Sequence, residues 1–154
     1  MAVKVLELHH HGIRVGASPE EVAKARRFYG DVLGLQPDTG RPTIPTIDGY
    51  WMDVGGTAQI HLMGVNGQSK FAKGPGQDPS LPHVALAVAD IQETRKELDR
   101  LKADYWTAES VVGPQSLQIF VKDPFNNIIE LHQIDTCRCV TARRPAAGGG
   151  GRMA

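Results

Sequence analysis

The sequence contains two related halves, and this internal repeat restricts the chain to folds built from two similar modules. Each half begins with a histidine and a short apolar run, followed by a capped amphipathic helix; the two segments cover residues 10–35 and 83–101. His83 follows His10 by 73 residues, close to half of the patterned length. We therefore expect two modules of the same topology within this chain of 154 residues.

Both predicted helices carry signals for their first turn. Ser18 is a suitable N-cap, with Pro19 at the first helical position and Glu21 at the third. This capping box satisfies two backbone donors that a helix start otherwise leaves unpaired. Asp90, with Glu93 three residues later, gives the second helix the same kind of start.

Strand-like runs follow each helix and are separated by turn residues. We predict strands near 43–47, 50–54 and 58–63 in the first half and near 105–109, 118–122 and 128–133 in the second. Each half then reads β-α-β-β-β, which makes the fold class α+β. The first module covers 1–65 and the second 82–135, and the Gly- and Pro-rich stretch 66–81 is the expected linker.

The last part of the sequence, residues 136–154, is rich in glycine and small residues, and we expect a disordered tail there. Cys137 and Cys139, the two cysteines of the chain, lie in this segment. A C-x-C pair can bind a soft metal, but no later cysteine or histidine completes a ligand set. We interpret both residues as free thiols.

The charge balance excludes some partners. Lysine plus arginine and aspartate plus glutamate both number 17, so nothing indicates a nucleic-acid-binding surface or attraction to an anionic membrane. The sequence contains neither an apolar run long enough to span a membrane nor a secretory h-region at its start. We expect a cytoplasmic protein.

Strand alternation sorts the polar residues onto faces. On the first strand His10 shares a face with Gly12, whereas His9 and His11 point to the helix side unless a bulge shifts the register. The next residues on the face of His83 are alanines. Such small neighbours leave room for a ligand on this face.

The final strand of each half supplies a matching polar residue, His61 in the first and Glu130 in the second. An unpaired carboxylate in the middle of a buried strand is strongly disfavoured, and metal ligation removes that penalty. Two equivalent pairs can converge on one point if the halves pack face to face. We predict one divalent ion at a site formed by His10, His61, His83 and Glu130.

Four runs resemble the vicinal oxygen chelate superfamily, which includes glyoxalases, epimerases, extradiol dioxygenases and bleomycin-resistance proteins: LHHHGIRV, RRFYGDVLGL, HVALAV and FVKDPFNNIIELHQ. The resemblance covers about residues 3–134 and implies two βαβββ modules that form a curved, partly closed mixed sheet around a metal site. It matches His10, His83 and Glu130 to ligand positions, and it places His61 where relatives have Glu or Gln. The ion implied is Ni, Zn, Co, Mn or Fe(II).

Further residues receive roles through this resemblance. Arg14 matches a substrate-anchoring arginine, and Glu130 is the expected catalytic carboxylate. Independently of the resemblance, Trp51 is expected to bind substrate in the pocket, with core packing as the alternative. His132 shares a face with Glu130, and it is either a proton donor or acceptor or a plain polar contact.

The resemblance does not fix the reaction, because one scaffold serves several chemistries. A metal-dependent lyase or isomerase that stabilises an enediolate-like intermediate of a small oxygen-chelating substrate is favoured. The alternatives are an Fe(II) ring-cleaving dioxygenase and a non-catalytic drug-binding protein, which a full ligand set disfavours. We expect a homodimer, with the site closed either within one chain or across the two.

Overall fold

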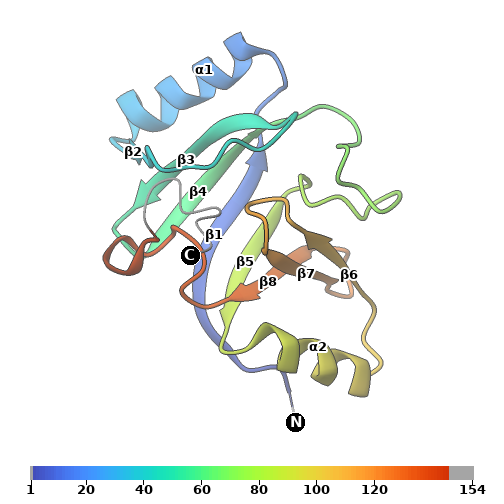
Figure 1. Cartoon of the computed structure of the whole chain (residues 1–154). Helices are drawn as coiled ribbons and strands as arrows, with labels where there is room; N and C mark the ends of the chain where they lie inside the picture. The colour runs from blue at the N-terminus through green and yellow to red at the C-terminus, as the bar shows by residue number, and fades with distance from the viewer. Residues whose placement is uncertain (1, 146–154) are drawn as a thin grey trace.

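The computed structural model describes residues 2–145, and their eight strands form one mixed sheet in the order β2-β3-β4-β1-β5-β8-β7-β6 (Figure 1). The first half contains β1 (Val5–Arg14), α1 (Pro19–Arg27), β2 (Gln36–Pro37), β3 (Asp48–Val54) and β4 (Ala58–Gly64). The second half contains β5 (His83–Val88), α2 (Ile91–Arg100), β6 (Tyr105–Glu109), β7 (Leu117–Lys122) and β8 (Ile128–Gln133).

The two halves repeat one topology. Within each half the first strand pairs in parallel with the last, β1 with β4 and β5 with β8, and the intervening strands continue antiparallel to the edge. The halves join where β1 and β5 pair antiparallel at the centre of the sheet. The α+β fold of two βαβββ modules, predicted from the repeat, is confirmed, and both modules belong to one chain.

Both helices begin where the capping signals place them. Ser18 Oγ accepts a hydrogen bond from the Glu21 backbone N–H at 3.1 Å, and the Glu21 carboxylate accepts one from the Ser18 N–H at 3.0 Å. The Asp90 carboxylate accepts from the first-turn amides of α2. A π-helical turn, Phe28–Val32, continues α1.

One face of the sheet carries the helices, with α1 against β3 and β4 and α2 against β7 and β8. The core under α2 is built from apolar side chains of β5, β7, β8 and the helix: Val88, Ile91, Leu98, Ile119 and Leu131. The opposite face, which carries His10, His61, His83 and Glu130, is called the site face below.

The extra strand of the first half differs from the prediction. Residues 43–47 form a turn closed by a single bridge between Ile44 and Ile47, because Pro45 lacks an amide donor and Thr46 has a φ of +67°. The pairing with β3 is made instead by the two residues of β2, Gln36 and Pro37. The corresponding strand of the second half, β6, is present as expected.

The segments outside the modules are tied to the sheet. In the linker, Asp78 accepts hydrogen bonds from Ser69 and Ser80 and is buried. Residues 136–145, expected to belong to a disordered tail, instead cross back from β8 towards the β3–β4 turn (Figure 1), where the Thr141 N–H donates to Gly56. A contact between residues far apart in the sequence holds this segment in place: Nε of Arg138 pairs with the buried carboxylate of Asp38 at 2.7 Å. The rest of that predicted tail, 146–154, lies outside the described residues.

Among the described residues, no helix combines the length and the apolar character needed to cross a membrane. The homodimer expected from the sequence stays a prediction.

Candidate metal centre

Three potential ligands from three neighbouring strands converge on the site face. His10 comes from β1, His83 from β5 and Glu130 from β8, and none is more than 5% exposed. Nε2 of His10 lies 3.2 Å from Nε2 of His83, and Oε2 of Glu130 lies 3.3 Å from the first and 3.1 Å from the second. The strand register produces this triangle, because Gly12 pairs with His83 and Ala85 with Glu130.

The triangle has the size that one divalent ion requires. Imidazole and carboxylate ligands lie about 2.0–2.2 Å from a transition-metal ion, so neighbouring ligands in octahedral or tetrahedral geometry are about 2.8–3.6 Å apart. All three sides of the triangle fall within this interval. Two histidines and one carboxylate suit Fe(II), and the same donors also suit Mn, Co, Ni and Zn. The residues present therefore fit the ion that the sequence implied.

Second contacts fix the orientation of these side chains. Nδ1 of His83 lies 2.7 Å from the carbonyl oxygen of Leu81, so this nitrogen carries the proton and Nε2 presents its lone pair to the triangle. Nδ1 of His132 lies 3.2 Å from Oε1 of Glu130, the oxygen that is not part of the triangle. Both contacts leave the ligand atoms free to bind.

The site is electrostatically suited to a cation. Burial alone would raise the pKa of Glu130, but the charge of His10 and hydrogen bonds from His10, His132 and His83 hold it well below 4.5. Burial lowers the pKa of His10, although Glu130 opposes this effect. The ionised carboxylate is the form of Glu130 that binds a metal ion.

His61 lies beside the triangle and not at its corner. Its ring stacks between those of His10 and Trp51, with centroid distances of 3.7 Å and 4.3 Å. Its Nε2 is 2.9 Å from Oε1 of Gln59. The potential ligand atoms of His61 group with His10 and Cys139, whereas His83 and Glu130 group with His10 alone. The structure thus brings the four predicted ligands together, but His61 is close to His10 only and is not part of the triangle.

Comparison with known proteins identifies the family. Residues 8–131 match the model of the Glyoxalase/Bleomycin resistance protein/Dioxygenase superfamily. The chain belongs to this superfamily. The resemblance read from the sequence is thereby confirmed, and the triangle occupies the site face of a glyoxalase-like fold. No curated protein matches the chain at a significant level.

Several solved structures share the fold. Methylmalonyl-CoA epimerase from Mycobacterium tuberculosis is 21% identical over 84% of this chain and 88% of its own, with a TM-score of 0.59. A hypothetical protein from Bacillus halodurans C-125 is 23% identical over 82% and 93%, with a TM-score of 0.60. Homoprotocatechuate 2,3-dioxygenase from Brevibacterium fuscum, in a mutant form, is 16% identical over 86% of this chain and 33% of its own, with a TM-score of 0.56. Likenesses at this identity show the fold alone.

The remaining residues predicted for the site divide into two groups. Trp51 and His132 line the main cavity, which has a volume of about 640 Å³. Arg14 does not line it, because its guanidinium donates to the carbonyl and hydroxyl oxygens of Ser80 at 3.0 Å and 2.7 Å. Arg14 therefore holds the linker against β1, and the structure supplies no contact between it and the cavity.

Two polar residues of the cavity were missed by the sequence analysis. Arg41 and Gln118 both line it, and Nε of Arg41 and Oε1 of Gln118 are buried without a hydrogen-bond partner among the described residues. A buried unsatisfied donor or acceptor costs free energy, so such atoms in a cavity favour a polar ligand. Both residues lie outside the aligned repeat positions, and no sequence signal distinguished them.

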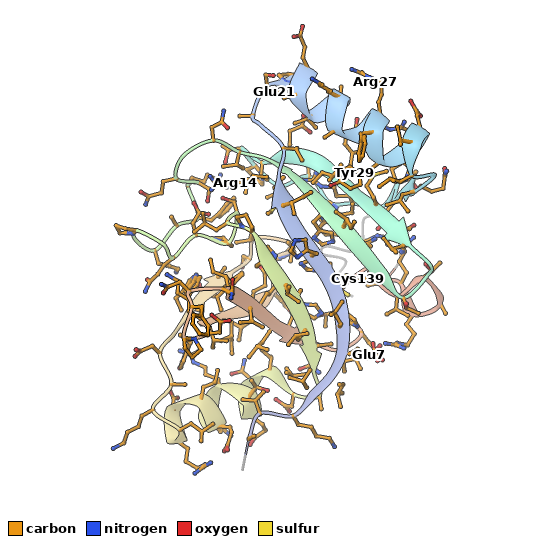
Figure 2. All side chains as sticks on the ribbon, turned by 180° about the vertical axis from the view of Figure 1, so that it is seen from behind. Glu7, Arg14, Glu21, Arg27, Tyr29 and Cys139 are labelled. Atoms are coloured by element: carbon orange, nitrogen blue, oxygen red, sulfur yellow. The ribbon has the colours of Figure 1, made fainter. Side chains whose placement is uncertain are left out.

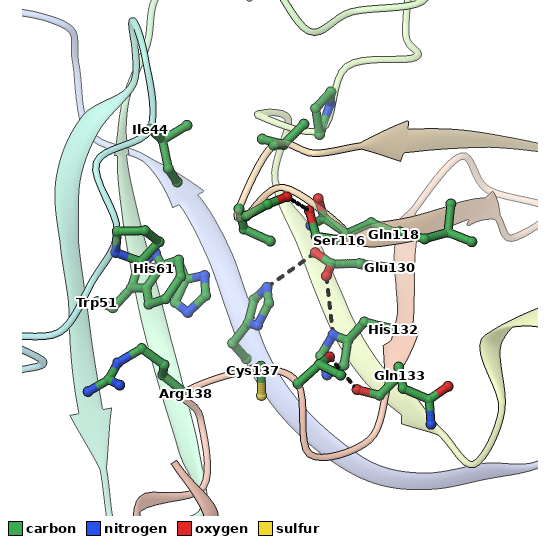
Figure 3. Close-up of a pocket in the computed structure, with 18 of the residues that line it drawn as sticks. Ile44, Trp51, His61, Ser116, Gln118, Glu130, His132, Gln133, Cys137 and Arg138 are labelled. Atoms are coloured by element: carbon green, nitrogen blue, oxygen red, sulfur yellow. Dashed lines mark hydrogen bonds and ion pairs between the residues drawn. The ribbon is translucent and has the colours of Figure 1, made fainter. Parts of the chain in front are cut away.

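The histidines and cysteines around the triangle were also misjudged. A bulge between Leu8 and His10 turns His9 onto the site face, where it is 1% exposed. Cys139 is 1% exposed, and its Sγ lies 3.5 Å from Nδ1 of His10 beside β1 (Figure 2). Cys137 and Arg138 border the same cavity (Figure 3). The thiols are free, as expected, but they belong to the site and not to a loose tail.

Proposed function

We propose that this protein is a metal-dependent enzyme that binds a small substrate through two adjacent oxygen atoms, with lyase or isomerase chemistry favoured. The observation that carries the proposal is the triangle of His10, His83 and Glu130, whose dimensions match one divalent ion. Three protein ligands leave coordination positions for a bidentate substrate. The cavity of about 640 Å³ beside the triangle is the size of a small-molecule site.

The ion, when bound, stabilises the negative charge that develops on a substrate oxygen after loss of a neighbouring proton. The chain contributes positioning. The unsatisfied Nε of Arg41 and Oε1 of Gln118 point to a substrate with an acidic or carbonyl oxygen and a hydroxyl or amide donor. Arg41 replaces Arg14 as our candidate for the substrate anchor.

Proton transfer requires a group that can accept a proton at neutral pH. Glu130 is the only carboxylate that lines the described cavity, and it is committed to the ion. Nε2 of His61 donates to the acceptor Oε1 of Gln59 at 2.9 Å, which leaves Nδ1 of this cavity-lining imidazole with a lone pair that can accept a proton. We therefore assign the base to His61, and we assign to His132 the positioning of Glu130 through the 3.2 Å contact.

A second candidate is an Fe(II)-dependent ring-cleaving dioxygenase. It is favoured by the position of His61 outside the triangle, since two histidines and one carboxylate with open positions are typical of Fe(II) oxygenases. A drug-binding protein without catalysis is disfavoured, because binding alone does not require a complete set of ligands.

The test begins with the metal content of protein purified without chelator, compared with the His83→Ala, Glu130→Ala double variant. His11→Ala, which changes an exposed histidine of the same strand, is the matched control. We expect about one equivalent of divalent ion at the triangle, lost in the double variant and kept in the control. If reconstituted protein holds no ion at these residues, the proposal is wrong and a cleft-binding protein is the better account.

The metal-loaded protein is then assayed with hemithioacetals and acyl-CoA thioesters for isomerisation, and with catechols for oxygen consumption. Proton exchange or isomerisation that is independent of oxygen supports the first function. Oxygen uptake with ring cleavage that requires Fe(II) supports the second.

A further inference from the structure

A second cluster of potential ligands lies next to the triangle, formed by His9, His132 and Cys137. Nδ1 of His9 is 2.7 Å from Nε2 of His132 and 3.0 Å from Sγ of Cys137. The two histidines are 1% and 5% exposed, and all three potential ligand atoms lie within 4.8 Å of one another. The cluster joins the β1 bulge, the end of β8 and the C-terminal segment.

Carboxylates determine which ring nitrogens carry protons. Nε2 of His9 is 2.7 Å from Oε2 of Glu7, and Nδ1 of His132 is 3.2 Å from Oε1 of Glu130. An ionised carboxylate only accepts hydrogen bonds, so each of these outer nitrogens must be the donor. Glu7 is held in place by Arg143, whose Nη2 lies 2.6 Å from the same oxygen.

The other ring nitrogens, Nδ1 of His9 and Nε2 of His132, then carry lone pairs that face one another. Nδ1 of His9 and Nε2 of His132, separated by 2.7 Å, cannot remain so close unless a positive centre lies between them. Cys137 brings a third electron-pair donor to the same point. In the absence of metal, a shared proton satisfies this arrangement, and a metal ion replaces the proton directly.

We infer that His9, His132 and Cys137 bind a second, thiophilic divalent ion such as Zn(II), at a site distinct from the His10, His83 and Glu130 triangle. Histidine ligands whose other nitrogen donates to a carboxylate are characteristic of zinc sites, and both histidines here have this feature. One thiolate and two imidazoles match zinc preferences, with a fourth position left for water or substrate.

The cluster requires only a small adjustment to hold the ion. Ligands about 2.0–2.3 Å from zinc lie about 3.3–3.6 Å apart, so the donor atoms must separate by roughly 0.6 Å. Cys137 follows β8 in an irregular segment, where such a shift disturbs no strand pairing. The bound ion then ties the segment that follows β8 to strands β1 and β8.

The test uses the reduced, metal-free full-length chain titrated with Co(II) under anaerobic conditions. The triangle has no sulfur ligand, so a thiolate-to-cobalt charge-transfer band in the near ultraviolet reports binding by a cysteine, and single variants of Cys137 and Cys139 show which one. We expect this band in the wild-type protein, its loss in Cys137→Ser, and its persistence in the matched control Cys139→Ser. A wild-type protein without the band, or a Cys137→Ser variant that keeps it, overturns the inference.

A measurement on the unmodified sequence guards against misfolded variants. Zn(II) is expected to slow alkylation of Cys137 by iodoacetamide at least tenfold, as mapped by peptide mass spectrometry, whereas equal alkylation rates with and without Zn(II) contradict the site. His83→Ala separates the two proposals. It should lose the triangle's ion and keep the charge-transfer band, so failure of the proposed function leaves the second site intact.

Discussion

Gly12 of β1 lies directly opposite His83 of β5, and a β-carbon at Gly12 would lie 2.7 Å from Cε1 and 2.9 Å from Nε2 of the imidazole. Both distances are shorter than van der Waals contact. The imidazole of His83 can therefore occupy its position only because Gly12, in the other half of the chain, has no side chain.

Gly12→Ala should displace His83 and weaken metal binding about 10- to 100-fold, the range expected when the support of a ligand is disturbed. Calorimetric titration of the metal-free protein measures this change. Gly30→Ala is the control, because the nearest atom to its new β-carbon is the flexible end of Arg26 at 3.4 Å. Equal affinities for the two variants would show that His83 is not a ligand.

His61→Gln should keep the metal content of the wild-type protein while lowering the turnover number about 10²- to 10⁴-fold, as expected for loss of a general base. The substitution preserves a polar side chain near Gln59 and removes the basic imidazole. Metal analysis and steady-state kinetics on the same preparation separate the two effects. Loss of the ion along with activity would instead assign His61 as a fourth ligand.

Asp38→Asn should lower the free energy of unfolding by about 2–3 kcal/mol at neutral pH, because buried charged hydrogen bonds are lost. The Asp38 carboxylate accepts from Nε and Nη2 of Arg138 at 2.7 Å and 2.8 Å and from the Gly40 N–H at 2.9 Å. Denaturant titrations of the wild type and variant measure the difference, with the exposed Asp104→Asn as control.

The same pair predicts a pH dependence. Burial alone would raise the pKa of Asp38, but Arg138, the Gly40 amide and Arg144 lower it below 3.8. A carboxyl group with a lowered pKa stabilises the folded state above its unfolded pKa, and this contribution is lost as the pH falls through the folded value. The stability difference between wild type and Asp38→Asn should therefore be full at pH 7 and shrink below pH 3.8. A difference that stays constant into acid would exclude the ion pair as its source.

Ser18→Ala should destabilise the protein by about 1 kcal/mol, the usual effect of removing an N-cap. Only the hydrogen bond from the Glu21 amide to Oγ is deleted, since Glu21 still accepts from the backbone N–H of residue 18. Thermal unfolding followed by circular dichroism measures the loss. Ser18→Asp, which retains a capping oxygen, should restore the wild-type value.

Local chemistry accounts for what the sequence could predict. The N-cap residues Ser18 and Asp90 marked both helix starts, and strand alternation placed His83 and Glu130 on the face opposite α2. Neither depends on distant contacts. The bulge that turns His9 inward has no glycine or proline to mark it, and burial of Cys139 follows from Arg138 meeting Asp38, a contact between residues 100 positions apart. Such long-range pairings are not encoded in a local pattern.

The central pairing of β1 with β5 also has a consequence for the history of such a chain. Each half alone carries one histidine on its first strand and one potential ligand on its last strand. Without the other half, one edge of that first strand would be unpaired. Two copies of a single ancestral half, paired along that edge, would have formed the same cavity with two identical donor pairs. A single chain that holds both halves lets the two donor pairs differ, so that His61 and Glu130 occupy corresponding positions while only Glu130 reaches the triangle.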